Sequence, residues 1–255
     1  MSGGEACGAS DYGENIAGDY DAFVGLHAPV DPVVEFLHSL VGGVGPALEL
    51  GGGTGRVAIP LGERGVAVHA PEVSPAMCRE LVNKDVQRLV RPVVADMSEF
   101  SLDIEFGLIY TVFNSFLFLT SRRAQARCLA AVARHLRADG TFVIEIAIPD
   151  FHLNPSLSRV SLTRSADGSP MMDIATIDPV AQLIEANHLL FGPDGIRVVP
   201  LTMRYVSLSE LDLMAESAGL LLTERCSGWD GSPVTRYSVS AVSVYQPAQG
   251  VGSTR

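Results

Sequence analysis

Short apolar segments alternate with segments of helical periodicity over the first 148 residues of the chain. The apolar segments are too short for buried helices and end at turn-forming residues, as strands buried on both faces do. Strands are predicted at Pro46–Leu50, Val66–Ala70, Pro92–Ala95, Phe106–Val112 and Thr141–Ala147, and helices from Asp31 and over Thr54–Glu63, Ser74–Asn83 and Ser121–Leu136. This alternation predicts a Rossmann-like α/β fold, in which helices cover both faces of a parallel sheet.

The pattern changes after Pro149. Strand-like segments now follow one another, with turn sequences at Ala166-Asp167-Gly168 and Gly192–Gly195. They are Arg159–Thr163, Met171–Ile177, Gln182–Phe191 and Ile196–Val206. We expect an antiparallel β layer inserted after the fifth strand. A helix behind the capping box Ser207–Glu210, followed by strands at Leu220–Cys226 and Tyr237–Tyr245, then completes a seven-stranded sheet.

Composition and charge narrow the function. The 255 residues carry a net charge of -11, and nucleic-acid-binding proteins concentrate Lys and Arg, so DNA and RNA are disfavoured as partners. No apolar run approaches the ~20 residues that cross a bilayer, so no membrane partner is expected. The polar start does not resemble a signal peptide, which favours a cytoplasmic location. The cysteines form no CxxC pair and have no zinc-like spacing with the histidines, so no metal is expected.

A glycine-rich turn follows the first strand. Gly51, Gly53 and Gly55 can adopt backbone angles closed to other residues, and the helix behind them offers unpaired N–H groups to a ligand. A dinucleotide site would require a third glycine where Arg56 stands, and a P-loop would require Gly-Lys-Ser/Thr. The helix contains Pro60, which predicts a bend.

Carboxylates follow the next two strands. Glu72 lies about 20 positions beyond the glycines, where an acidic residue binds ribose hydroxyls in nucleotide-binding βαβ units. Asp96 ends the third strand, where it can accept from an adenine amino group. Met97 or Met77 can pack on the ring, although core packing explains either methionine as well. Together these residues indicate a nucleoside site.

Five segments resemble the motifs of class I S-adenosylmethionine-dependent methyltransferases. They are Leu48–Arg56, Glu72–Met77, Asp96-Met97, Tyr110–Ser115 and His135–Gly140. Gly52 and Ala70-Pro71 depart from the commoner residues without removing any chemistry. The resemblance implies S-adenosylmethionine as the methyl donor. It also implies a set of donor-binding residues: Tyr20, Gly51, Gly53, Gly55, Arg56, Glu72, Val73, Met77, Asp96, Met97 and Phe113.

The N-terminal sequence narrows the resemblance. Asp19–Phe23, with Tyr12 ahead of it, is similar to the lid of antibiotic-pathway N-methyltransferases of the amino-sugar and lincosamide type. The inserted β layer is similar to the substrate lid of these enzymes and of glycine N-methyltransferase. We therefore expect a lid segment (1–30), a donor-binding core (31–148), a substrate-lid insertion (149–206) and a last helix with its strand pair (207–247).

The topology of the predicted sheet indicates where the methyl acceptor binds. In doubly wound sheets ligands collect at the carboxyl ends of the strands, which selects four residues for the acceptor site: Phe113, Asn114, Glu145 and Trp229. Trp229 is equally explained as a packing aromatic. Tyr12 and Tyr20 are candidates to close over the donor and orient an amine, or they simply pack the lid. His188 is the first candidate for a general base and Glu185, which points to the opposite strand face, the second.

The expected reaction is in-line transfer of a methyl group from S-adenosylmethionine to an amine nitrogen of a small secondary metabolite. An O-methyltransferase of a natural-product pathway is the nearest alternative. A nucleotide-binding oxidoreductase and a non-catalytic binding protein are alternatives from other classes. Phe113–Phe116 lacks the Asn/Asp-Pro-Pro-aromatic motif of nucleic-acid amino-methyltransferases. A small molecule is the expected partner, and the sequence leaves room for a homo-oligomer.

Overall fold

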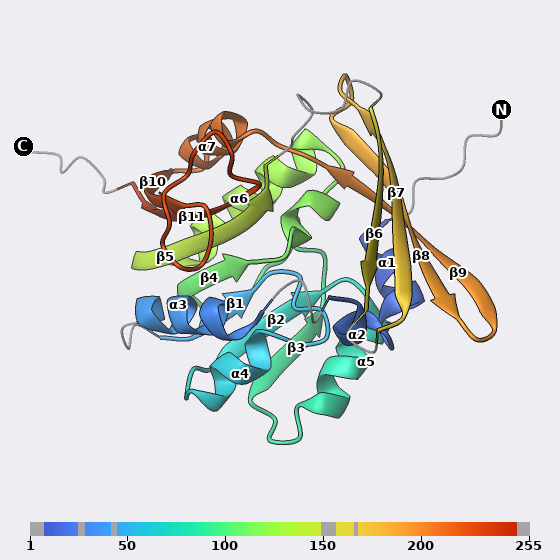
Figure 1. The fold of residues 1–255 in the computed structure, drawn as a ribbon. Helices are drawn as coiled ribbons and strands as arrows, with labels where there is room; N and C mark the ends of the chain where they lie inside the picture. Colours follow the sequence, from blue (N-terminus) through green and yellow to red (C-terminus); the bar gives the residue numbers. More distant parts are fainter. Residues whose placement is uncertain (1–7, 25–28, 42–44, 149–156, 166–167, 249–255) are drawn as a thin grey trace, which may run out of the picture.

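A computed structural model describes residues 8–24, 29–41, 45–148, 157–165 and 168–248 of the chain (Figure 1). A seven-stranded sheet in the order β10-β11-β5-β4-β1-β2-β3 forms its centre. The strands are β1 (Ala47–Glu49), β2 (Val68–Glu72), β3 (Val90–Val94), β4 (Phe106–Thr111), β5 (Leu136–Ala147), β10 (Leu220–Cys226) and β11 (Ser240–Pro247). Strands β1 to β5 pair in parallel, and β11 pairs antiparallel with both β5 and β10. The predicted Rossmann-like seven-stranded fold is confirmed.

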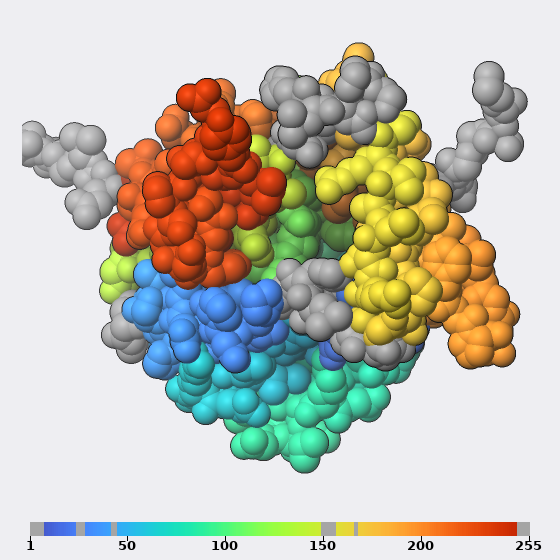
Figure 2. All heavy atoms as spheres, viewed as in Figure 1, coloured from blue at the N-terminus to red at the C-terminus, as the bar shows by residue number. Residues whose placement is uncertain are grey.

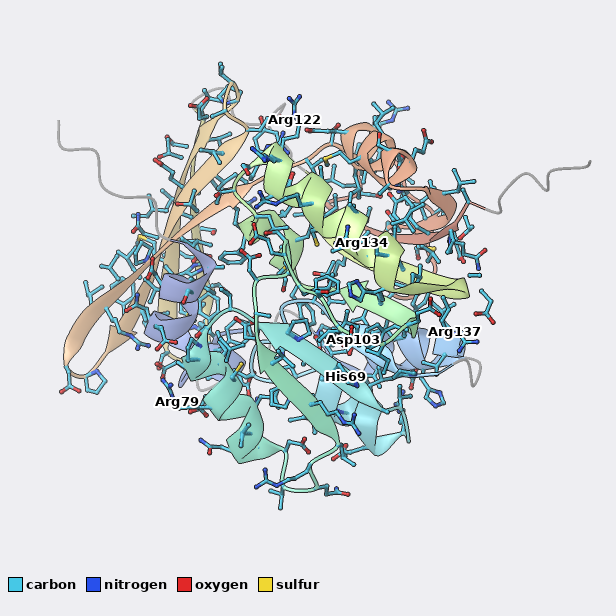
Figure 3. The ribbon with its side chains drawn as sticks, turned by 180° about the vertical axis from the view of Figure 1, so that it is seen from behind. His69, Arg79, Asp103, Arg122, Arg134 and Arg137 are labelled. Carbon is cyan, nitrogen blue, oxygen red and sulfur yellow. The ribbon has the colours of Figure 1, made fainter. Side chains whose placement is uncertain are left out.

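Helices cover both faces of the sheet. Buried side chains of α3 (Asp31–Val41), α4 (Ala58–Glu63) and α5 (Pro75–Lys84) pack on one face, and those of α6 (Arg122–His135) and α7 (Leu208–Ser217) on the other. Helix α6 is amphipathic: Leu129 and Val132 are fully buried, while Arg122 and Arg134 point away from the sheet into solvent (Figure 3). Burial of both faces explains why the central strands β1 and β4 are buried along their whole length. None of the described helices is long and apolar enough to cross a membrane.

Several element boundaries differ from the prediction, and the largest shifts are at the starts of α4, β5 and β11. Helix α4 begins at Ala58, not Thr54, because the glycine turn continues through residues 54–57. Pro60 is therefore the third residue of α4, in the first turn, where proline is tolerated without a kink, so the reason for expecting a bend there does not hold. Strand β5 begins at Leu136, which pairs with Phe106, so the segment before Gly140 is extended and not a plain turn.

The chain inserts a second sheet between β5 and α7, as predicted. Its antiparallel strands are β6 (Ser158–Arg164), β7 (Pro170–Asp178), β8 (Leu183–Gly192) and β9 (Gly195–Arg204), in that order. This sheet stands beside the core sheet in Figure 1. Of the predicted turn Ala166-Asp167-Gly168, the first two residues lie outside the described residues.

Two short N-terminal helices lie between the inserted sheet and the core. Helix α1 (Ala9–Ile16) packs on β9 and α5, and α2 (Tyr20–Val24) follows it. The Glu14 carboxylate accepts from Ser74 Oγ at 2.9 Å and from the Ala76 N–H at 2.7 Å, at the start of α5. Asp21 accepts from Thr54 Oγ1 at 2.6 Å. These bonds hold the N-terminal segment against the glycine turn.

Candidate functional site

The site lies where β1 and β4 separate, at the carboxyl ends of the strands. The order of the sheet reverses there, which opens the crevice in which α/β sheets bind ligands. Gly51 and Gly53 have φ of +71° and +53°, angles that L side chains rarely adopt. A Cβ on Gly51 would lie 2.9 Å from Ser115 Cβ and 3.0 Å from Met97 Cε. Glycine at position 51 therefore keeps a narrow space open above the turn.

The side chain of Glu72 contacts this turn. One carboxylate oxygen accepts from the Gly53 N–H at 3.0 Å and the other from the Ser74 N–H at 2.9 Å. Burial raises the pKa of Glu72 above its ordinary value, and these backbone hydrogen bonds act in the opposite direction. The sequence-predicted carboxylate thus lies in direct contact with the glycine bend. Each of its oxygens retains a lone pair with which it can accept from a ligand hydroxyl.

An inner cavity of about 290 Å³ lies over this turn. Most of the predicted donor-binding residues line it: Tyr20, Gly51, Gly53, Glu72, Val73, Met77, Asp96 and Met97. Leu119 and the N-terminal residues Gly8 to Ser10 also contribute to the wall. One oxygen of Asp96 accepts from the Ser98 N–H at 2.7 Å, which fixes the carboxylate beside Met97. A wall that contains two carboxylates and two methionine side chains fits a nucleoside.

Of the predicted donor-binding residues, Gly55, Arg56 and Phe113 do not line the inner cavity. A Cβ on Gly55 would lie 2.9 Å from Leu81 and from Ile59, so this glycine allows close packing inside the core. The Arg56 guanidinium lies 4.9 Å from the centre of the Phe113 ring. It also lowers the pKa of buried Glu49, although desolvation is the larger effect and raises that pKa to about 8. Arg56 thus connects the glycine turn with the loop after β4.

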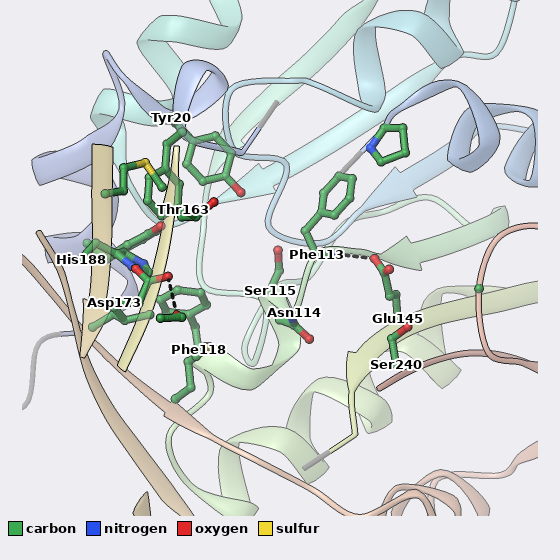
Figure 4. Close-up of a pocket in the computed structure, with 18 of the residues that line it drawn as sticks. Tyr20, Phe113, Asn114, Ser115, Phe118, Glu145, Thr163, Asp173, His188 and Ser240 are labelled. Carbon is green, nitrogen blue, oxygen red and sulfur yellow. Dashed lines mark hydrogen bonds and ion pairs between the residues drawn. The ribbon is translucent and has the colours of Figure 1, made fainter. Parts of the chain in front are cut away.

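An outer cavity of about 640 Å³ adjoins the inner one. The side chains common to both walls are Tyr12, Tyr20, Ser115 and Phe118. Figure 2 shows the surface hollowed between the yellow strands of the inserted sheet and the red C-terminal strands. The close-up in Figure 4 shows His188 and Asp173 on one side of the outer cavity and Asn114 and Glu145 on the other.

Tyr12 and Tyr20 both lie at the boundary between the cavities. Tyr12 is 8% exposed, and its ring centre lies 5.0 Å from that of Phe118. Desolvation raises the pKa of Tyr20 to about 12 and that of Tyr12 well above 10. Both hydroxyls are therefore protonated at neutral pH, so they can donate a hydrogen bond but cannot act as bases.

His188 and Asp173 form a pair on the cavity face of the inserted sheet. The register aligns them on β8 and β7, and His188 Nδ1 lies 2.6 Å from Asp173 Oδ1. The Phe23 ring lies 4.6 Å from the imidazole. Glu185 is exposed on the other face of β8 and does not line the outer cavity, because successive side chains alternate along a strand. The structure therefore separates the two candidate bases.

The loop after β4 is strained and held by side chains. Phe113 and Asn114 have φ of +51° and +65°, in the left-handed region. Glu145 accepts from the Phe113 N–H at 2.8 Å and from Trp229 Nε1 at 3.1 Å, and Asn114 Oδ1 accepts from the Ala147 N–H at 2.6 Å. All four residues line the outer cavity, and they also fix its floor.

The sequence analysis missed Asp173, Ser115 and Phe118. Asp173 becomes recognisable only when the register of β7 and β8 is known, since it lies opposite His188. Ser115 and Phe118 belong to a short 3-10 helix, Ser115–Phe118, whose apolar sequence resembles ordinary core. Among the described residues, no group of three or more His, Cys, Asp or Glu side chains is arranged to hold a metal ion.

Comparison with known proteins identifies the family. A family model described as a methyltransferase domain matches residues 47–140. The solved structure of the CcbJ methyltransferase from Streptomyces caelestis is 32% identical, with a TM-score of 0.86 over 93% of this chain and 98% of that chain. A cypemycin N-terminal methyltransferase from a Streptomyces species is 27% identical over 192 residues, which are 75% of this chain and 78% of the relative. The sugar N-methyltransferase KedS8 from a Streptoalloteichus species shares the fold, with 19% identity and a TM-score of 0.67 over 96% of both chains.

The similarity to CcbJ extends over nearly the whole of both chains, well beyond the matched domain. In this chain the structure places the glycine turn, the carboxylate that contacts this turn and the inserted antiparallel sheet around two adjoining cavities. With this similarity and this site, the chain belongs to the class I S-adenosylmethionine-dependent methyltransferases.

Proposed function

We propose that this enzyme methylates an amine nitrogen of a small natural product and that the acceptor binds in the outer cavity. The charge and the residue composition of the wall of the outer cavity support the proposal. Asp173 and Glu145 line it together with several aromatic rings, and none of the described lining residues is Lys or Arg. Carboxylates and aromatic faces both attract a cation, so the cavity favours a protonated amine over an anionic acceptor.

The donor is assigned to the inner cavity. Glu72 would accept from the ribose hydroxyls, Asp96 from the adenine amino group, and Met97 and Val73 would pack on the base. This placement leaves Tyr20 and Ser115, which line both cavities, beside the sulfonium. When bound, S-adenosylmethionine would supply an electrophilic methyl group: a neutral nucleophile would attack the methyl carbon in line with the C–S bond, and S-adenosylhomocysteine would leave as a neutral thioether.

The enzyme mainly aligns the two reactants and removes a proton. An amine that enters as an ammonium ion must lose a proton before it can attack. When His188 donates its Nδ1 hydrogen to Asp173, Nε2 carries a lone pair that can take this proton. The hydroxyls of Tyr12 and Tyr20 would orient the amine at the boundary, and closure of the cavity wall excludes water.

One relative supports the choice of nitrogen. The relative that is 27% identical is a cypemycin N-terminal methyltransferase, and its acceptor belongs to a natural product. The inserted sheet provides a large cavity with only a few charged groups, which suits an organic acceptor larger than a free amino acid.

The proposal is tested with S-adenosylmethionine carrying a ¹³C-labelled methyl group. The enzyme is incubated with amino sugars, small peptides with a free N-terminus, and matched compounds in which a hydroxyl replaces the amine. We expect label only in the amines, with the methyl ¹³C shift of an N-methyl group. Label on the hydroxyl compounds alone would instead identify an O-methyltransferase.

A further inference from the structure

A third cavity, of about 460 Å³, adjoins the outer cavity beside α2 and the inserted sheet. We call it the side cavity. Its wall includes Asp19, Phe23, Met171, Leu190, Phe191 and Arg197, and of these Phe23 and Met171 also line the outer cavity. The residues assigned to the donor and to proton transfer do not line the side cavity. It therefore needs an explanation of its own.

The strand register places the outer and side cavities over consecutive rows of side chains on one face of the inserted sheet. Asp173 on β7 pairs with His188 on β8, and both line the outer cavity. Two residues along the strands, Met171 pairs with Leu190, which pairs with Arg197 on β9, and these three line the side cavity. Alternate residues of a strand share a face, so the two rows are about 7 Å apart. A ligand that extends along β8 from His188 toward Leu190 would therefore pass from the outer cavity into the side cavity.

Helix α2 contributes a side chain to each junction between cavities. The half-buried Phe23 ring lies 4.6 Å from the His188 imidazole, where the outer and side cavities meet. Tyr20, three residues earlier in α2, lies where the inner and outer cavities meet. Side chains three residues apart lie on the same face of a helix. The three cavities are thus arranged in series along this face of α2.

The charged groups of the side cavity are largely paired with each other. Arg197 forms an ion pair with Asp19 and donates to the Asn15 carbonyl at 3.3 Å, and among the described lining residues it is the only cation. Asp194 adds a further carboxylate, so an anionic ligand is disfavoured. Most of the remaining side chains on the wall are aliphatic or aromatic, and Met171 is buried. The side cavity therefore suits an apolar group.

We propose that the side cavity is a second part of the acceptor site and binds an apolar group that the acceptor carries about 7 Å beyond the end that faces His188. This inference rests on the proposed function in placing the acceptor in the outer cavity. The acceptor is then an extended molecule with an aliphatic or aromatic substituent, and not a compact polar amine. Contacts of this substituent with Met171 and Leu190 lie away from the reacting atoms, so they contribute to binding more than to kcat.

Isothermal titration calorimetry on the full chain saturated with S-adenosylhomocysteine tests the proposal. The probes are two pairs, butylamine with 4-phenylbutylamine and butanol with 4-phenylbutanol, and within each pair only the phenyl group differs. We expect the phenyl member to bind the wild type at least tenfold more tightly, or about 1.4 kcal/mol. The variants Ala22→Trp and Leu190→Trp place a large ring in the side cavity from α2 and from β8. In both, the gain from the phenyl group should fall to about threefold or less, while the Kd for butylamine stays unchanged.

Ala181→Trp is the matched control, because it introduces the same ring at an exposed position in the turn between β7 and β8, away from all three cavities. It should keep the full gain from the phenyl group, and thermal melts show that each variant folds. A gain that persists in both filled variants, or no gain in either pair of probes, would overturn the proposal. Equal affinity for amines and alcohols, with the gain lost in the filled variants, would support the side cavity and contradict the proposed preference for an amine.

Discussion

Replacement of Gly51 by alanine tests how tightly the glycine turn is built around the donor. At φ +71° the backbone cost of an L residue is about 1–2 kcal/mol. The new Cβ would also lie 2.9 Å from Ser115 Cβ and 3.0 Å from Met97 Cε, and such overpacking costs about 1–3 kcal/mol. The free energy of unfolding should therefore fall by about 2–5 kcal/mol, which lowers Tm by about 4–20 °C in a domain of this size.

Gly65→Ala is the matched control. Gly65 also has a positive φ, +88°, but a Cβ there would meet no atom within 4 Å. The Gly65→Ala variant should have only the backbone cost of the positive φ, which lowers Tm by about 2–8 °C. Gly65 does not line the inner cavity, so its replacement should leave donor binding unchanged. In Gly51→Ala the displaced Ser115 and Met97 side chains line that cavity. The Kd for S-adenosylhomocysteine should rise at least tenfold, or about 1.4 kcal/mol.

Isothermal titration calorimetry measures the Kd, and differential scanning calorimetry measures Tm. Comparison of the two variants separates the backbone cost of a positive φ from the cost of the overlap with Ser115 and Met97, since only Gly51→Ala has both. Wild-type affinity in the Gly51→Ala variant would refute the placement of the donor above the turn. An equal loss of Tm in both variants would refute the overlap with Ser115 and Met97.

Further predictions concern the acceptor side and pH. His188→Asn should lower kcat by about 10²-fold, whereas His38→Asn, at an exposed histidine on α3, should leave kcat unchanged; an unchanged kcat in the His188→Asn variant would exclude His188 as the base. The double variant Tyr12→Phe and Tyr20→Phe should lower kcat with little change in the Kd for the donor, because only the two hydroxyls are lost. An unchanged kcat would show that both side chains only pack in the lid. Glu49 has a folded-state pKa of about 8 against an ordinary 4.5, so the folded state binds the proton more tightly and stability falls as pH rises from about 4.5 to 8. Denaturation of Glu49→Gln across this range should show a flatter dependence, and an identical dependence would contradict the burial of this carboxyl.

The fold was largely predictable because burial imposes a pattern on the sequence. Strands that are covered on both faces must be apolar throughout, as β4 is from Phe106 to Thr111. The inserted sheet was also predictable from its turn residues. The start of α4 was not, because no capping or turn signal in residues 54–57 marks where the turn ends and the helix begins. Local propensity could not reveal this, since the turn is fixed by contacts between the glycines and Glu72.

The candidate site was predictable on the donor side and only partly on the acceptor side. Glu72 and Asp96 follow strands of the same parallel sheet, so their order along the chain implies their proximity. Asp173 and His188 are brought together by the register of an antiparallel pair, and a shift of one residue would place them on opposite faces. Tyr12 lies at the boundary of the cavities because α1 packs on β9 and α5. The hydrophobic periodicity of the sequence does not predict such tertiary contacts.

A crystal structure with S-adenosylhomocysteine and a methylated product tests the central claim directly. That claim is the assignment of the donor to the inner cavity and of the acceptor to the outer cavity, with the transferred methyl group at their boundary. The account predicts the ribose hydroxyls on Glu72, the sulfur beside Tyr20 and Ser115, and an N-methyl group that points from the outer cavity toward this sulfur. A nucleoside bound away from Glu72, or a product bound outside the wall that contains Asp173 and His188, would contradict it.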